Sequence, residues 1–335
     1  MKAIVYTEHG LPIDDPRALQ DTELPAPQPG PRDLLVKVRA VAVNPVDTKV
    51  RKGSPTGQPR VLGWDCSGVV EAVGAAVTLF KPGDEVFYAG SITRPGSYSE
   101  YHLVDERIAG HKPGKLDFAQ SAALPLTSIT AWELLFDRLK VPENGGKGMA
   151  ILIIGAGGGV GSILTQLARK LTRLTVIGTA SRDITRKWVA ALGAHHVIDH
   201  SQPMKPQLEA LGLPEVDIVV SLTNTDSHYP AVIDLIKPQG QFALIDDPAL
   251  LDAMPLKRKA ISLHWELMFT RPMFETPDMV RQHELLERVA QLVDTGVLTT
   301  TASEHVGAIT AANLRRAHAL VESGKAHGKI VLEGF

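Results

Sequence analysis

Apolar residues follow two different periodicities along the chain. Through the first 120 residues the pattern is that of short strands, as at 36–41, where apolar and polar side chains alternate as in a strand with one buried face. Residues 80–86 place a Pro-Gly-Asp turn before the next apolar run, and glycines recur throughout this region. The pattern predicts a small, strongly curved β domain.

From about residue 126 the pattern alternates between strands and helices. Strands are expected at 149–154, 174–179, 196–198, 216–222 and 241–245, and helices at 129–139 and 160–171. Such alternation implies a parallel sheet with helices on both faces. Beyond about residue 270, amphipathic helices at 285–293 and 311–321 precede a short strand at 329–332.

These patterns predict an α/β protein of two domains. The β domain is expected to comprise residues 1–125 and 269–335, and a doubly wound parallel-sheet domain, residues 126–268, is inserted within it. A length of 335 residues with 44% apolar residues agrees with two domains that each bury a core.

Charge and composition exclude several classes of partner. Lys and Arg number 35 against 37 Asp and Glu, so no excess of positive charge favours nucleic acid. No apolar stretch approaches the ~18 to 20 residues of a membrane span, and the first residues lack a secretory apolar core. We expect a cytoplasmic protein that acts on a small molecule. The single cysteine, Cys66, can form neither an internal disulfide nor a thiolate metal site by itself.

The apolar run that ends at residue 154 leads into a glycine-rich turn and then a helix. Residues 155–161, Gly-Ala-Gly-Gly-Gly-Val-Gly, are close to the G-x-G-x-x-G fingerprint, with Ala156, Gly158 and Gly161 at its small positions. Ala156 permits a tight turn, Gly158 lets the backbone approach a pyrophosphate, and Gly161 lets the helix pack against the strand. We predict that this turn, with Gly159 and Val160, binds a dinucleotide, whereas an isolated glycine motif would equally be a plain turn.

The end of the next strand indicates which dinucleotide is bound. An NAD site places Asp or Glu there, whereas this chain has Ser181 and Arg182, with Lys187 further on. A hydroxyl and two cations suit a 2′-phosphate, so NADPH is favoured. The alternative is that Ser181 caps the following helix and Arg182 is solvated, with Asp183 repelling a phosphate.

Several further motifs extend over nearly the whole chain. They are Asn-Pro-Val-Asp at 44–47 with Arg-Lys-Gly at 51–53, Gly-Trp-Asp-Cys-Ser-Gly-Val-Val at 63–70, Lys-Pro-Gly-Asp at 81–84, Leu-Pro-Leu-Thr-Ser at 124–128, Leu-Gly-Ala at 192–194 and Gly-Lys-Ile-Val-Leu at 328–332. With the glycine turn, they resemble the quinone oxidoreductase-like branch of the medium-chain dehydrogenase/reductase superfamily. Within it they resemble the bacterial zinc-type alcohol dehydrogenase-like subgroup.

That resemblance implies a GroES-like domain, a Rossmann domain, a cleft between them and a homodimer. It also allows the zinc positions of the superfamily to be compared. Asn44 stands where the first cysteine ligand would be, and Trp64 and Asp65 stand at the His-Glu position. An amide and an indole are not ordinary zinc ligands, so we predict no metal. Among the histidines, His195, His196 and His200 are densest, but we interpret them as a surface strand end.

The resemblance also marks candidate catalytic residues. Asn44 and Asp47 are expected near the nicotinamide, although Asn44 followed by a proline is equally typical of a helix cap. Lys49 replaces a tyrosine donor that relatives often have, so we predict that it stabilises an enolate or quinol oxyanion.

The remaining candidates surround the cofactor and substrate. Thr127, Asn224 and Lys329 are expected to contact the cofactor, with a helix cap and a polar strand face as alternatives for Thr127 and Lys329. An apolar substrate wall is expected from Trp64, Met268, Phe269 and Phe274, unless they are core residues.

Without a metal, hydride transfer suits a substrate whose developing charge is delocalised. We therefore expect an NADPH-dependent oxidoreductase of quinones or α,β-unsaturated carbonyls. The alternatives are a zinc-independent alcohol or aldehyde reductase and an NADPH-binding module with little turnover.

Overall fold

The computed structural model describes all of residues 1–335, and the chain divides into two compact units. Unit 1 comprises Met1–Ile129 and Phe269–Phe335, and unit 2 comprises Thr130–Met268. The first boundary therefore lies inside the helix Pro125–Trp132. No helix is both long and apolar enough to cross a membrane.

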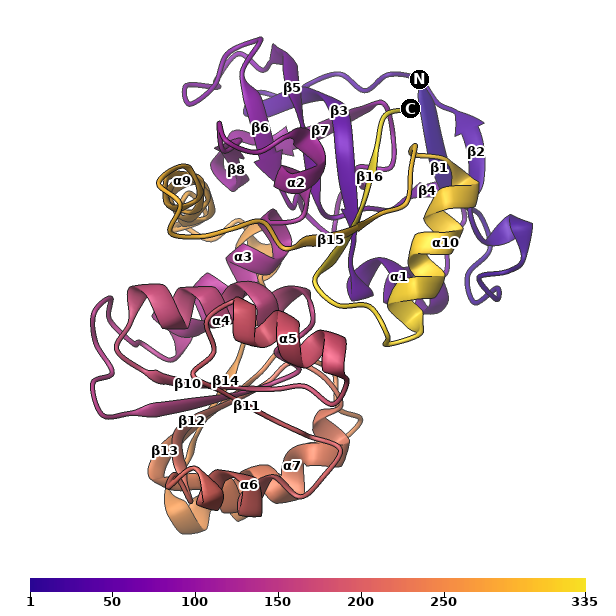
Figure 1. Ribbon diagram of the computed structural model, residues 1–335. Helices are drawn as coiled ribbons and strands as arrows, with labels where there is room; N and C mark the ends of the chain where they lie inside the picture. Colours follow the sequence, from indigo (N-terminus) through magenta and orange to yellow (C-terminus); the bar gives the residue numbers. More distant parts are fainter. The chain divides into compact units, whose positions relative to one another are not determined.

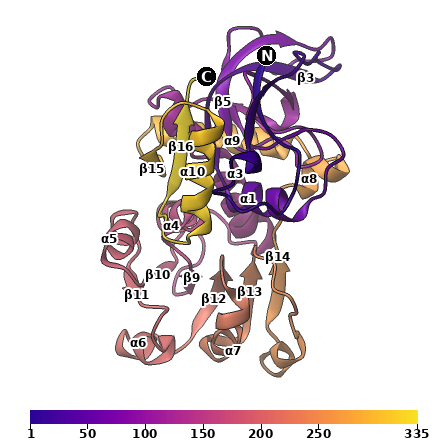
Figure 2. The ribbon, with the colours of Figure 1, turned by 90° about the vertical axis from the view of Figure 1, so that its right-hand side faces the viewer.

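Unit 2 is built around a parallel sheet of six strands in the order β11-β10-β9-β12-β13-β14. Its strands are β9 (Ala150–Ile154), β10 (Thr175–Thr179), β11 (His196–Ile198), β12 (Val216–Ser221), β13 (Ile236–Leu244) and β14 (Ser262–Trp265). The arrowheads of β12, β13 and β14 point the same way in Figure 2. From β9 the chain adds β10 and β11 on one side of the sheet, and then β12, β13 and β14 on the other. The strand order therefore reverses between β9 and β12. In doubly wound sheets that reversal marks the ligand-binding edge.

Helices cover both faces of this sheet, as the alternating pattern predicts. They are α4 (Gly159–Leu171), α5 (Asp183–Ala191), α6 (Met204–Ala210) and α7 (Thr225–Leu235). In Figure 1, α4 and α5 lie on one face and α6 and α7 on the other. The central strand β9 consists entirely of buried apolar residues and its neighbour β12 mostly of them, which is typical of a sheet covered on both sides.

Unit 1 contains a seven-stranded, mainly antiparallel sheet and a three-stranded one. The larger sheet has the order β15-β16-β3-β5-β6-β8, with β7 also paired to β3, and the smaller has the order β2-β1-β4. The strands are β1 (Lys2–Tyr6), β2 (Gln20–Glu23), β3 (Asp33–Val43), β4 (Arg60–Val61), β5 (Cys66–Val73), β6 (Glu85–Tyr88), β7 (Tyr101–Asp105), β8 (Ala109–His111), β15 (Ala302–His305) and β16 (Lys329–Glu333). The long strand β3 pairs with three others, and its pairing with β16 joins the two separated parts of this unit.

Six helices belong to unit 1, one of them in part. They are α1 (Pro45–Gly53), α2 (Phe118–Ala122), α3 (Pro125–Trp132, which continues across the unit boundary), α8 (Thr270–Phe274), α9 (Arg281–Asp294) and α10 (Ala311–Glu322). Helix α1 begins directly where β3 ends, and α10 packs against α1 and β16. The end of β3 and the starts of β5, β16 and α1 therefore meet in one region of unit 1.

Candidate active site

The glycine turn between β9 and α4 has the strand-turn-helix context that a dinucleotide fingerprint requires. Gly155 has φ +84°, so the tight turn falls at this glycine, whereas the sequence led us to assign it to Ala156. Ala156 is instead completely buried, with its Cβ facing β10 at Gly178. Gly158, Gly159 and Val160 are accessible at the start of α4. The helix N-terminus therefore offers its unsatisfied N–H groups where a phosphate can approach.

Gly158 and Gly161, the last two small positions of the fingerprint, differ in how closely other atoms surround them. A Cβ on Gly161 would lie 2.4 Å from the Gly155 carbonyl oxygen, so only glycine lets α4 pack this closely against the turn. A Cβ on Gly158 would meet nothing nearer than 3.5 Å, and φ there is −78°. Protein packing therefore explains why position 161 requires glycine, but it does not explain the glycine at position 158. The space beside Gly158 can admit a ligand.

The residues expected to select the cofactor follow β10. Ser181, Arg182 and Lys187 are all exposed. Arg182, not Ser181, occupies the N-cap of α5, and its side chain makes no capping hydrogen bond, so the capping alternative for Ser181 does not apply. Asp183 is the exposed first residue of α5. Ser181 and Arg182 are thus presented to solvent at the carboxyl edge of the sheet, and Lys187 is exposed on α5.

Asn224 follows β12 at the same edge and has a left-handed backbone. Its φ is +51°, and it precedes α7 without a side-chain cap. Asparagine tolerates this conformation better than most residues. The exposed amide therefore remains available for a ligand at the carboxyl ends of the strands.

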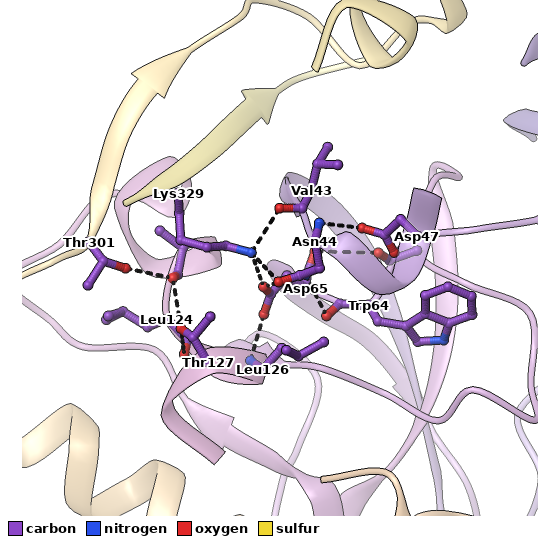
Figure 3. A network of polar contacts seen from close by, with 12 residues as sticks. Val43, Asn44, Asp47, Trp64, Asp65, Leu124, Leu126, Thr127, Thr301 and Lys329 are labelled. Carbon is purple, nitrogen blue, oxygen red and sulfur yellow. Dashed lines mark hydrogen bonds and ion pairs between the residues drawn. The ribbon is translucent and has the colours of Figure 1, made fainter. Parts of the chain in front are cut away.

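In unit 1, Lys329 is the centre of a buried polar network (Figure 3). Its ammonium lies 2.9 Å from Asp65 Oδ2 and 3.0 Å from the Val43 carbonyl oxygen, and it also donates to Asn44 Oδ1. Asp65 Oδ1 accepts the Leu126 N–H at 2.8 Å. An ammonium has three protons to donate, and all three have acceptors here. A contact between Lys329 and a cofactor would require one of these bonds to be exchanged.

The side-chain amide of Asn44 also has hydrogen-bond partners for both its nitrogen and its oxygen. Its Nδ2 donates to Asp65 Oδ2 at 2.8 Å and to the Trp64 carbonyl oxygen at 3.3 Å, while its Oδ1 accepts from Lys329. The Asp47 carboxylate accepts the Asn44 N–H at 2.6 Å, as in a capping box at the start of α1. The amide therefore joins α1 to the Asp65–Lys329 pair.

Asp47 is completely buried on α1, and its Oδ1 has no hydrogen-bond partner. Tyr98 Oη donates to Asp47 Oδ2 at 3.2 Å and lies 3.4 Å from His318 Nε2. Burial raises the pKa of Asp47 to about 7, against the Asn44 N–H and Lys329, which lower it. Near neutral pH this carboxyl can therefore be protonated, as a proton donor must be.

The other expected residues of unit 1 have different environments. Lys49 is exposed on α1. Thr127 is buried in the first turn of α3, which begins at Pro125, so it is not the helix cap; its hydroxyl donates to the Leu124 carbonyl oxygen at 3.1 Å.

The expected apolar wall is only partly assembled. Trp64 and Phe269 are buried with ring centroids 6.1 Å apart in an edge-to-face arrangement, and the Trp64 indole donates to the Ser91 carbonyl oxygen. Met268 is also buried, whereas Phe274 is 72% exposed. Phe274 therefore does not share their buried packing.

The residues at the superfamily's zinc position do not fit zinc. Asn44 offers an amide, Trp64 offers no lone pair, and Asp65 is neutralised by an ammonium that would repel a divalent cation. No group of three or more His, Cys, Asp or Glu side chains is arranged to hold a metal ion. Burial raises the pKa of the neighbouring Cys66 thiol to about 12, so this thiol is protonated near neutral pH.

Some polar residues of these sites were not found from the sequence. Tyr98 and His318 come from a loop and from α10, and no local motif links either to Asp47. Thr179, at the end of β10, accepts the Gly155 N–H through its hydroxyl. Only Asp65 carries a feature in the sequence that could have indicated the polar network. A carboxylate directly before an apolar strand needs a buried partner.

Comparisons with known proteins agree with this architecture. The family model described as the alcohol dehydrogenase GroES-like domain matches residues 30–114, and the one described as zinc-binding dehydrogenase matches residues 192–332. A zinc-type alcohol dehydrogenase-like protein of Staphylococcus aureus strain MSSA476 is 41% identical over 338 residues, covering 99% of each chain. A quinone oxidoreductase of Pongo abelii is 37% identical over 261 residues, or 76% of each chain.

Two solved structures extend the comparison. A Rhizobium etli CFN 42 protein, provisionally named a zinc-dependent alcohol dehydrogenase, is 59% identical with a TM-score of 0.96, covering 100% of this chain and 98% of that one. Mycobacterial Rv1454c, in complex with NADPH, is 27% identical with a TM-score of 0.84 over 99% of each chain.

The predicted resemblance is confirmed: the chain belongs to the medium-chain dehydrogenase/reductase superfamily, with a GroES-like domain and a Rossmann-like parallel-sheet domain. It is an oxidoreductase of this superfamily, with relatives named both as zinc-type alcohol dehydrogenase-like proteins and as quinone oxidoreductases.

Proposed function

We propose that this protein is an NADPH-dependent, metal-independent reductase of quinones or α,β-unsaturated carbonyls. The observation that carries the proposal is the Lys329–Asp65–Asn44 network, which fills the superfamily's zinc position with an ammonium and its acceptors. A substrate whose negative charge delocalises as hydride arrives needs no metal to polarise it, whereas a simple alcohol does. The named quinone oxidoreductase relative supports the same class of substrate.

The cofactor side of the proposal rests on unit 2. The accessible backbone at Gly158, Gly159 and Val160 would hold the pyrophosphate, and Ser181, Arg182 and Lys187 would hold a 2′-phosphate. Asn224 would contact the cofactor at the end of β12. The bound nicotinamide supplies the hydride. The NADPH complex of a relative that is 27% identical supports the choice of cofactor.

On the substrate side, we assign the proton to Asp47 and the oxyanion to Lys49. Asp47 is buried, with a pKa raised to about 7, so a protonated fraction is available near neutral pH. Lys49 is an exposed donor on the same helix. Asn44 and Lys329 hold the start of α1 in place, and Thr127 would face the nicotinamide. Unchanged turnover in Lys49→Ala would remove the oxyanion role.

A panel of substrates tests the proposed function. Oxidation of NADPH is followed by absorbance with ortho-quinones, 2-alkenals and simple aldehydes, each with and without added zinc. We expect turnover of quinones or alkenals that zinc does not change. Turnover of simple aldehydes alone would favour a zinc-independent alcohol or aldehyde reductase, and tight NADPH binding without turnover would favour a binding module.

We further propose a homodimer in the cytoplasm, where NADPH is available. Strand β14 is an edge of the parallel sheet, with Trp265 51% exposed and Leu267, just beyond the strand, 53% exposed. An open edge with apolar side chains is a surface on which a second copy can pair. Sedimentation of Trp265→Lys against the wild type tests this, because loss of the dimer is expected only if the edge is the interface.

A further inference from the structure

Two histidines lie at the carboxyl edge of the parallel sheet in unit 2. His200 follows β11 and His228 is in the first turn of α7, and their ring centroids are 5.8 Å apart in an edge-to-face arrangement. Both side chains are partly exposed. The sequence led us to group His200 with His195 in a surface cluster, but His195 Nδ1 accepts the Val176 N–H near the opposite, amino end of β10. The structure therefore separates His200 from that group.

A single hydroxyl connects His200 to the glycine turn. Thr179 Oγ1 accepts the Gly155 N–H at 3.1 Å and lies 3.0 Å from His200 Nδ1. Thr179 is buried at the end of β10, so it cannot move freely. The position of the imidazole is thereby fixed relative to the turn that would hold the pyrophosphate.

The strand order places these residues side by side. Strands β11, β10, β9 and β12 are consecutive neighbours, and His200, Thr179, Gly155 and His228 lie at or just beyond their carboxyl ends. In a doubly wound site the pyrophosphate lies at the turn after the first strand, and the adenosine ribose lies at the end of the second. Here the second strand is β10, whose other neighbour is β11. The adenosine end of a bound dinucleotide would therefore lie beside His200.

Burial and nearby charged groups set the pKa values of the two imidazoles. Burial lowers the pKa of both histidines. A carboxylate partly offsets this effect in each case: Asp199 raises the pKa of His200, and Asp246 raises the pKa of His228. His200 itself lowers the pKa of His228 further. On α5, the Arg186 guanidinium donates to the Ala180 and Val197 carbonyl oxygens, beside the same strand ends. Both imidazoles are therefore largely uncharged at neutral pH, and an added anion would favour protonation of one of them.

We propose that His200 and His228 recognise the 2′-phosphate end of NADPH, and that one of the two takes up a solvent proton when that phosphate binds. The imidazolium formed donates an N–H to the phosphate and offsets part of its charge. The affinity for NADPH then rises as the pH falls, whereas the affinity for NADH, which lacks this phosphate, does not. This inference rests on the proposed use of NADPH and adds a pH-dependent device for choosing it.

Calorimetric titration with NADPH and with NADH tests the proposal. The binding enthalpy is measured near pH 7.5 in buffers of different ionisation enthalpy, which gives the number of protons taken up. We expect uptake with NADPH that exceeds uptake with NADH, and a marked decrease of that excess in at least one of His200→Gln and His228→Gln, namely the variant that lacks the imidazole that is protonated. We also expect each variant to lose about tenfold in NADPH affinity near pH 6.5, the equivalent of one pKa unit, with little change for NADH. His196→Gln, on β11 itself, is the matched control and should behave as the wild type.

Three results would overturn the inference. The first is equal proton uptake with NADPH and NADH in the wild type, a measurement that depends on no variant. The second is unchanged uptake in both glutamine variants. The third is an equal loss of affinity for both cofactors, which would mean that the histidines pack against the adenine only. If the wild type binds neither cofactor, the proposed function fails as well, so the two failures are distinguishable.

Discussion

Lys329 Nζ lies 2.9 Å from Asp65 Oδ2 although both side chains are buried, so the first residue of the last strand neutralises a carboxylate 264 positions earlier. The pair is completed by Asn44 and by the Leu126 N–H, which leaves neither charge without partners. A buried ion pair stabilises a protein little compared with apolar residues of similar volume, but removing one partner is costly. The proposed function rests on the position of this pair, where the resemblance places the zinc ligands of the superfamily.

Lys329→Met should destabilise the protein by about 3 to 5 kcal/mol, because it leaves the Asp65 charge buried and unpaired. Urea denaturation of the wild type and the variant measures the change in the free energy of unfolding. The double variant Lys329→Met/Asp65→Asn should recover a large part of the loss, since it removes both charges. Lys81→Met is the control: Lys81 is paired with Asp84 at 2.9 Å but is 81% exposed, so we expect a change of at most about 1 kcal/mol. Equal losses in the two single variants would contradict this explanation.

The two glycines of the turn should respond differently to alanine. Gly161→Ala places a methyl group 2.4 Å from the Gly155 carbonyl oxygen, so we expect a loss of about 1 to 3 kcal/mol in stability. Gly158→Ala meets no such obstacle and should leave the melting temperature nearly unchanged while weakening NADPH binding at least about tenfold. Thermal unfolding and fluorescence titration measure the two effects. Normal NADPH affinity in Gly158→Ala would argue against a pyrophosphate at this turn.

Arg182→Ala should weaken NADPH binding by about 2 kcal/mol, the order of a charge-assisted hydrogen bond, and leave NADH binding nearly unchanged. The exposed Arg173, which precedes β10 at the amino edge of the sheet, provides Arg173→Ala as a matched loss of charge. We expect no change in the ratio of the two affinities in that control. If both variants alter the ratio equally, overall charge and not a phosphate contact sets the preference.

Asp47 should make stability depend on pH. Its pKa is raised from 3.8 to about 7 by burial, so between these values the folded protein binds more protons than the unfolded chain. This contribution to stability is present in full below pH ~4 and is lost as the pH rises toward ~7, a loss on the order of a few kcal/mol. Asp47→Asn should flatten that part of the stability profile, while the exposed Asp14→Asn should not. An unchanged slope in Asp47→Asn would show that the carboxyl titrates normally.

The sequence was most informative where a structural feature depends on residues that are close together in the chain. Gly161 was correctly predicted to permit close packing of the helix, because that contact lies within one strand-turn-helix unit. The start of α4 and the extent of β11 also agreed with the apolar pattern, within one residue. Strand β14 was missed because its short segment, Ser-Leu-His-Trp at an edge, is too polar for a buried strand pattern.

Long-range polar contacts could not be predicted. The partner of Asp65 is Lys329, and nothing local to either residue identifies the other. The contact between His200 and His228 depends on the order of strands in the sheet, which separates β11 from β12 by two neighbours. Composition could therefore exclude a cysteine zinc site, but only the folded chain shows which groups occupy its place.

We propose that an ammonium–carboxylate–amide network, and not a zinc ion, stands at the reaction site. The most direct measurement follows the rate of NADPH oxidation with an ortho-quinone before and after exhaustive chelation, together with elemental analysis of protein purified without chelator or metal-affinity resin. We predict less than stoichiometric zinc and an unchanged rate. Stoichiometric zinc whose removal abolishes turnover, and whose return restores it, would contradict the account.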